Sequence, residues 1–201
     1  MKYKVIDNFL DEEYFDSLVT LFTDKENTGN NLMPWFFISS ISYPKKHKKW
    51  VVEDKLFYMS HMFYDGNQTT SNHFDKLFPI LEKLEVKCLL RIKANLYPNT
   101  EILHEHPMHI DYDFLHTGAI LSLNTCDGYT KLVDGTKIDS IANRVLLFDS
   151  SKDHCSTTTT NVPARININI NYIQEQYKEQ KKSASTQTFD YYGRSESPNN
   201  E

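Results

Sequence analysis

Residues 165–172 read RINININY, a strict alternation of polar and apolar side chains. Because successive side chains of a strand point to opposite faces, Arg165 and the three asparagines share one face, and the isoleucines share the other. We expect the isoleucine face to pack under helices. The polar face then lines the interior of a barrel, where a polar ligand can bind; a polar face that meets solvent is the alternative.

Short segments separated by turn residues precede this stretch from about residue 86 onward, which is the pattern of a sandwich or barrel. Apolar residues at helical spacing predict earlier helices at 12–22 and 73–84, and alternation predicts a strand at 35–43. Helices followed by a run of strands predict a mainly β, α+β fold in which two helices back an antiparallel barrel. The expected barrel strands are 88–97, 108–112, 118–124, 129–133, 136–139, 144–148, 156–160 and 165–173.

The chain of 201 residues suits one domain, which we place at 1–177 with its core strands at about 86–173. Residues 178–201 are polar and lack apolar periodicity, so we expect a disordered tail; a docking peptide is the alternative. Residues 45–49 read KKHKK, which predicts a solvated loop, with a patch that faces phosphate or an acidic substrate as the alternative.

Composition excludes several classes of protein. The net charge is −5, which argues against nucleic acid as a partner, because phosphate contacts need a basic surface. No apolar run approaches the roughly 20 residues that span a bilayer, and no apolar signal segment is visible. Three cysteines are too few for a disulfide framework. We therefore expect a cytoplasmic protein without a membrane partner.

The histidines are unevenly distributed, with five of eight between residues 104 and 154. On a strand, His109 and Asp111 point to the same face, so an imidazole and a carboxylate converge on one point. His154, 43 residues after Asp111, follows the expected strand 144–148 and can supply a third ligand. Two histidines and one carboxylate on one face of a metal are typical of non-haem Fe(II) oxygenases.

Arg165 follows His154 by 11 residues. A co-substrate that chelates iron through a 2-oxo acid group also carries a remote carboxylate, and a buried guanidinium is a planar two-point partner for it. A surface salt bridge is the alternative role for this arginine.

This ordered set resembles the Fe(II)/2-oxoglutarate-dependent oxygenases of the prolyl 4-hydroxylase-like kind, including small uncharacterised members from marine bacteriophages. The segment that carries this resemblance runs from about residue 89 to residue 172. It comprises Asn95-Leu96-Tyr97, His109-Ile110-Asp111, Leu121-Ser122-Leu123-Asn124, Asp127-Gly128-Tyr129-Thr130, Val145-Leu146-Leu147-Phe148, His154 and Arg165. The chain departs from the family where Asp127 replaces the first residue of a Gly-Gly-x-Thr turn, and where Arg165 stands in place of a frequent lysine.

The resemblance implies a double-stranded β-helix (jelly-roll) core with N-terminal backing helices. It implies Fe(II) on His109, Asp111 and His154, and the distal carboxylate of 2-oxoglutarate on Arg165. The further co-substrate contacts that it implies come from Tyr97, Asn95, Ser122 and Asn167, the last in place of a frequent Ser or Thr.

By the same resemblance, O2 is a second co-substrate, ascorbate is an accessory reductant, and succinate and CO2 are products. The hydroxylated substrate is then a peptidyl-prolyl group, another peptide or a small molecule, in the cytoplasm of a host cell if the chain is virus-encoded.

Two alternatives stay open. His104 and His106, with Asp111 and His154, mimic the metal motif of a cupin, which has the same barrel but does not use 2-oxoglutarate. A catalytically silent barrel that binds a ligand is the other alternative. Otherwise we expect His104 and His106 on the loop that enters the metal strand, and His116 in a turn.

Overall fold

The computed structural model describes residues 3–23, 33–39 and 56–174. The expected tail at 178–201 and the basic run at 45–49 lie outside this part, so the single domain at 1–177 stays a prediction. The described residues contain two α-helices, one 3-10 helix and eleven strands. They are β1 (Tyr3–Ile6), α1 (Glu12–Thr23), β2 (Phe36–Ile38), β3 (Tyr58–Asp65), β4 (Gln68–Thr69), η1 (Phe74–Leu77), α2 (Phe78–Lys83), β5 (Cys88–Pro98), β6 (Thr117–Ser122), β7 (Tyr129–Leu132), β8 (Lys137–Asp139), β9 (Val145–Asp149), β10 (His154–Cys155) and β11 (Ala164–Ile173).

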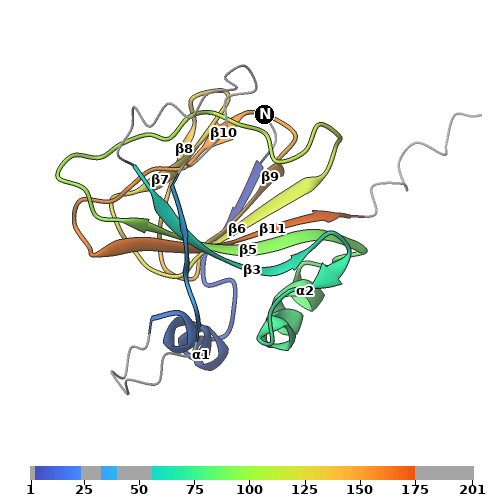
Figure 1. Ribbon diagram of the computed structural model, residues 1–201. Coiled ribbons are helices and arrows are strands. Elements are labelled where there is room, and N and C mark those ends of the chain that lie inside the picture. Colours follow the sequence, from blue (N-terminus) through green and yellow to red (C-terminus); the bar gives the residue numbers. More distant parts are fainter. Residues whose placement is uncertain (1–2, 24–32, 40–55, 175–201) are drawn as a thin grey trace, which may run out of the picture.

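Two antiparallel sheets form the barrel (Figure 1). The large sheet has the order β1-β9-β6-β11-β5-β3-β2, with β4 paired to β3, and the small sheet has the order β10-β7-β8. Strand β11 lies in the middle of the large sheet, between β6 and β5. The predicted mainly β, jelly-roll fold is confirmed.

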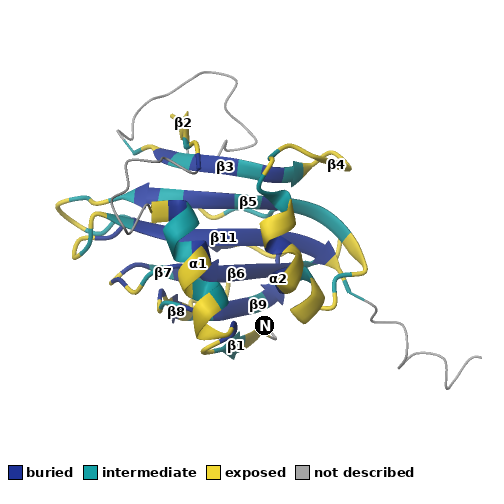
Figure 2. Ribbon diagram, turned by 90° about the horizontal axis from the view of Figure 1, so that it is seen from below, coloured by how far each residue is buried: buried dark blue, intermediate teal, exposed yellow. Residues whose placement is uncertain are grey.

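Both helices cover the outer face of the large sheet, as Figure 2 shows. Leu18 of α1 and Ile80 of α2 belong to the same buried cluster as Ile168, which is fully buried. The isoleucine face of β11 therefore packs under the helices, as predicted. Its polar face is also buried, with exposed fractions of 1% for Arg165 and 0% for Asn171, so it lines the barrel interior and does not meet solvent.

Local sequence explains where the helices begin and why one is interrupted. The Asp11 carboxylate accepts a hydrogen bond from the Tyr14 N–H at 2.9 Å and caps α1, which ends one residue beyond the predicted range. The continuous helix predicted at 73–84 is wrong, because η1 comes first and α2 begins only at Phe78. Pro79 has no N–H for an intrahelical hydrogen bond, so the chain starts a new helix there.

Several strand predictions also need correction. Residues 108–112 form only one isolated bridge, between His109 and His154, and the chain bends at Asp111. Residues 156–160 likewise make isolated bridges and no strand. Strands β1, β3, β4 and β10 were not predicted, and β2 is the described part of the strand expected at 35–43.

No helix among the described residues has the length and apolar character needed to cross a bilayer.

Candidate metal centre and co-substrate pocket

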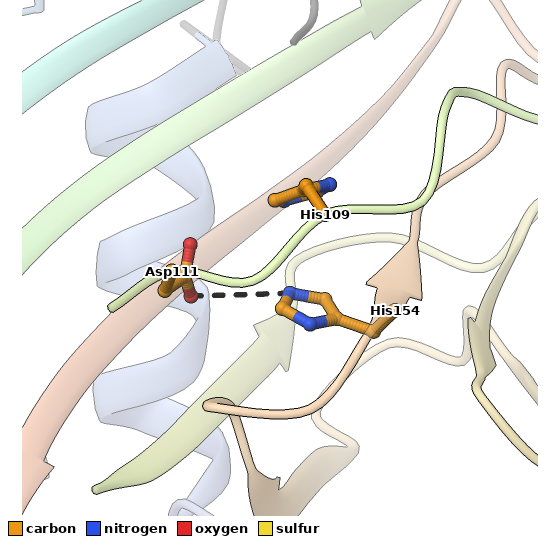
Figure 3. A group of neighbouring side chains, drawn as sticks. All are labelled: His109, Asp111 and His154. Carbon is orange, nitrogen blue, oxygen red and sulfur yellow. Dashed lines mark ion pairs between the residues drawn. The ribbon is translucent and has the colours of Figure 1, made fainter. Parts of the chain in front are cut away.

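Three side chains converge inside the barrel: His109, Asp111 and His154 (Figure 3). Their potential ligand atoms lie within 4.8 Å of one another. Two backbone hydrogen bonds of 3.0 Å join His109 to His154, and the Asp111 N–H donates to the Ser150 carbonyl at 3.1 Å. These contacts fix the His-x-Asp segment next to His154 and Ser150 without a full strand, and its two ligand side chains lie close to His154.

Backbone carbonyl groups orient the rings of His109 and His154. Nδ1 of His109 lies 3.3 Å from the Pro107 carbonyl, and Nδ1 of His154 lies 3.0 Å from the Lys152 carbonyl. An Nδ1–H that donates to a carbonyl leaves the Nε2 lone pair free for a metal. Burial lowers the pKa of His154 to about 4, so its ring is neutral at pH 7. Nε2 of His154 faces Oδ2 of Asp111 at 3.9 Å.

Asp111 is held by a dense set of donors. Its Oδ1 accepts from Arg91 Nη2 at 2.7 Å, and its Oδ2 accepts from Ser150 Oγ at 2.6 Å and from Asn171 Nδ2 at 2.8 Å. Burial alone raises the pKa of this carboxyl, but Arg91, His154 and the hydrogen bonds together hold it well below its usual range. The carboxylate is thus charged and oriented, as a metal ligand must be.

Arg165 begins the polar face of β11 and is 1% exposed. Nη1 donates to Ser156 Oγ, and Nη2 donates to Thr130 Oγ1 at 3.0 Å. Its Nε has no hydrogen-bond partner within residues 3–23, 33–39 and 56–174. Among the described residues, no carboxylate lies within ion-pair distance of this guanidinium. The charge is buried against hydroxyls and the Tyr97 ring, whose centroid lies 5.7 Å from the guanidinium carbon.

Gly128 lets the chain approach Arg165 closely. A Cβ at Gly128 would lie 2.7 Å from Arg165 Cδ and 2.7 Å from the Thr158 carbonyl oxygen. The turn that differs from the family pattern at Asp127 therefore keeps the glycine that packing requires, and Thr130 at its end contacts Arg165.

A cavity between the two sheets joins Arg165's hydroxyl partners to the metal ligands. Asn95 Nδ2 donates to Asn167 Oδ1 at 3.0 Å in its wall, and Asn95 Oδ1 has no partner. Burial raises the pKa of Tyr97, which stacks on Tyr58. The lining residues are Tyr58, Lys93, Asn95, Tyr97, His109, Ile120, Thr130, His154, Cys155, Ser156, Asn167 and Asn169.

Five of the eight predicted site residues line this cavity, whereas Asp111, Arg165 and Ser122 do not. Ser122 is buried opposite Asn167 in the strand register but is not among the lining residues. His104 and His106 are outside the cluster of potential ligands, so the cupin-like set is not brought together. His106 is buried against the Tyr97 ring, with centroids 5.0 Å apart, and His116 is buried next to Asn171.

Sequence reasoning missed Arg91 and Lys93, although a signal was available. Both have the same parity on β5 as Asn95 and Tyr97, so the period of two places them on the interior face. Ser150 and Ser156, which hold Asp111 and Arg165, lie outside the strands and carry no comparable signal.

Comparison with solved structures identifies the class of fold. A prolyl hydroxylase from Trichoplax adhaerens, solved in complex with a hypoxia inducible factor oxygen degradation domain peptide fragment, matches with a TM-score of 0.57 at 15% identity, over 86% of this chain and 84% of that one. A Pseudomonas putida prolyl-4-hydroxylase matches with a TM-score of 0.53 at 14% identity, over 86% and 92%.

The viral collagen prolyl hydroxylase of Paramecium Bursaria Chlorella virus-1, solved as a 2-oxoglutarate complex, matches with a TM-score of 0.52 at 13% identity, over 87% and 97%. No protein-family model and no curated protein matches the chain. The chain therefore shares the fold of these prolyl hydroxylases, and the predicted resemblance is confirmed at the level of the fold.

Proposed function

We propose that this chain is an Fe(II)- and 2-oxoglutarate-dependent dioxygenase that hydroxylates a C–H bond of a peptidyl-prolyl, other peptidyl or small-molecule substrate. The observation that carries the proposal is Arg165, a buried guanidinium without a carboxylate partner in the described part of the chain. A buried charge without a counter-ion is unfavourable. 2-Oxoglutarate offers a distal carboxylate to Arg165 and a chelating 2-oxo acid group to the metal.

The donor set fits a divalent iron. His109, Asp111 and His154 would hold it through two imidazole nitrogens and one carboxylate, which leaves three positions of an octahedron open. Bound there, Fe(II) supplies the reaction with O2 that couples decarboxylation of 2-oxoglutarate to hydroxylation. The balance is one 2-oxoglutarate, one O2 and one C–H group consumed, with succinate, CO2 and C–OH formed; one oxygen atom enters succinate and the other enters the hydroxyl group.

The protein's own residues bind and orient the co-substrate in this proposal. Arg165, positioned by Thr130 and Ser156, pairs with the distal carboxylate. Tyr97, Asn95 and Asn167 contact the co-substrate from the wall of the cavity. Ser122 supports Asn167 from the neighbouring strand. The sheets on both sides exclude water from this space.

The test is anaerobic binding followed by turnover. Addition of 2-oxoglutarate to the Fe(II)-loaded chain should give the visible charge-transfer band of a chelated 2-oxo acid, and admission of O2 should give succinate. His109→Ala and Asp111→Ala should remove both signals. Full 2-oxoglutarate decarboxylation by the double variant would refute the proposal. Metal binding without any succinate across a broad substrate panel would favour the silent ligand-binding barrel.

A further inference from the structure

One cation in the cavity has no function in the proposal above. Lys93 lies on β5, directly opposite Asn169 of β11, and lines the same cavity as His109 and His154. Its Nζ lies 5.8 Å from the centroid of the Tyr58 ring. It is close enough to the metal ligands for its charge to contribute to the lowered pKa of His154. Lys93 therefore lines the cavity together with the two histidines, whereas Arg165 lies behind its lining residues Thr130 and Ser156.

Lys93 has no carboxylate within ion-pair distance in the described part of the chain, unlike other cations nearby. Arg91 pairs with Asp111 at 2.7 Å, and Lys131 pairs with Glu105 at 2.7 Å. Within residues 3–23, 33–39 and 56–174, no carboxylate lies within ion-pair distance of Lys93, and its ammonium donates no hydrogen bond. Burial and the neighbouring Arg91 lower its pKa to about 8, so most molecules still carry the charge at pH 7.

The co-substrate does not account for this charge. The two carboxylates of 2-oxoglutarate, together with Asp111, offset the divalent metal and Arg165. Two positive charges, on Arg91 and Lys93, then remain in excess. Arg91 still donates to Asp111, whereas Lys93 has no carboxylate within ion-pair distance in the described part of the chain. Asn169 Oδ1, buried and without a hydrogen-bond partner, adds an unused acceptor at the same level of the sheet. The cavity thus offers one positive charge and one acceptor that the protein does not satisfy.

We propose that Lys93 and Asn169 form a subsite for the primary substrate, and that this substrate carries a carboxylate. The inference rests on the proposed function. A single ammonium matches the single charge of a carboxylate, whereas phosphate sites usually combine an arginine or several backbone N–H donors. Asn169 Oδ1 accepts a hydrogen bond from an N–H or O–H group of the same molecule. A small acid of the amino-acid type satisfies both groups and places a neighbouring C–H bond at the metal.

The test is a binding measurement on the full chain loaded with Zn(II), which accepts the same ligands and is redox-inactive. Saturating 2-oxoglutarate first fills the metal and Arg165. Ligand-observed NMR then compares acids with their neutral amides, acetate against acetamide and L-proline against L-prolinamide. The variants are Lys93→Gln, Lys93→Arg as the conservative replacement, and Lys87→Gln as a matched control, since Lys87 is exposed just before the same strand.

The wild type should bind the acid about tenfold more tightly than its amide, because one charge-assisted hydrogen bond distinguishes them. Lys93→Gln should abolish this preference, whereas Lys93→Arg and Lys87→Gln should keep it. The affinity for 2-oxoglutarate should change by less than about twofold in Lys93→Gln.

Equal binding of acid and amide by the wild type overturns the inference, and this outcome does not depend on the folding of any variant. A loss of 2-oxoglutarate affinity in Lys93→Gln of about tenfold or more also overturns it, because Lys93 then serves the co-substrate. Failure of the Zn(II)-loaded wild type to bind 2-oxoglutarate, measured before any acid is added, refutes the proposed function itself.

Discussion

Arg91 and Arg165 lie on paired strands of one barrel, but of the two only Arg91 forms an ion pair with a carboxylate in the described part of the chain. Arg91 donates to Asp111 at 2.7 Å, keeps a side-chain exposure of 17% and lies over the Tyr112 ring. Arg165 is 1% exposed, and in the described part of the chain its partners are hydroxyls, one carbonyl and an aromatic face. Arg91 thus has a charged partner that it positions, whereas the charge of Arg165 leaves room for an anionic ligand, as the proposed function requires.

The largest expected effect is on co-substrate binding by Arg165→Met. Loss of a two-point, charge-assisted pair worth about 3 kcal/mol should weaken 2-oxoglutarate binding to the Zn(II)-loaded chain about 100-fold. The free energy of unfolding of the ligand-free chain should not fall, because the variant removes a buried charge that has no counter-ion. Calorimetric titration and urea denaturation measure the two quantities. Arg144→Met, which breaks the surface pair with Asp7, is the control, and an unchanged 2-oxoglutarate affinity in Arg165→Met would refute the assignment.

Arg91→Met should show the opposite pattern. Its free energy of unfolding should fall by about 2 kcal/mol, because the buried Asp111 carboxylate loses its counter-ion; partial exposure of Arg91 keeps the loss below that of a fully buried pair. The double variant with Asp111→Asn should lose less than the sum of the single variants. Strict additivity in urea denaturation would show that the two side chains are not coupled.

Gly128→Ala tests how closely Arg165 is packed. The new Cβ meets the Thr158 carbonyl, which belongs to the backbone and cannot move aside easily, so the free energy of unfolding should fall by about 1.5 kcal/mol. Displacement of the Arg165 side chain should also weaken 2-oxoglutarate binding. Thermal unfolding and the same titration measure both effects, and wild-type values in both would mean that the close approach is not required.

The smallest expected effect is on the pH dependence of stability, and it distinguishes His154 from Arg165. The pKa of His154 falls from its ordinary value of 6.5 to about 4 on folding, so between these values the unfolded chain binds the proton and the folded chain does not. Lowering the pH from 7 to 5.5 should therefore reduce the free energy of unfolding of the metal-free protein by about 1 kcal/mol through this group. His154→Gln should remove that part of the pH dependence; Arg165→Met should leave it intact, because arginine does not titrate in this range.

Much of this site could be predicted from residues close together in the sequence. The alternation in β11 fixes which side chains share a face, and apolar burial under the helices then turns Arg165 and the asparagines inward. The spacing of His109, Asp111 and His154 was sufficient to predict their convergence, although the strand expected at 108–112 does not form. Two backbone hydrogen bonds to His154 take the place of that strand.

Other features depend on contacts between distant segments. Strand β3 pairs with β5, yet the polar residues Ser60 and His61 are buried in it. Its sequence therefore lacks the polar–apolar alternation that predicts a strand. His106 is buried against Tyr97, although its neighbours in the sequence predict only a loop.

The amino-acid sequence by itself determined the β-rich fold, the inward polar face of β11 and the order of the three potential metal ligands. These follow from the period of two along a strand and from the burial of apolar side chains, both of which are local. Only the tertiary structure decided which cations have a counter-ion. Arg91 meets Asp111 and Asn171 from strands and loops up to 80 residues apart, whereas Arg165 and Lys93 meet no carboxylate among the described residues. Charge pairing depends on the register between such distant segments, and no spacing along the chain encodes that register.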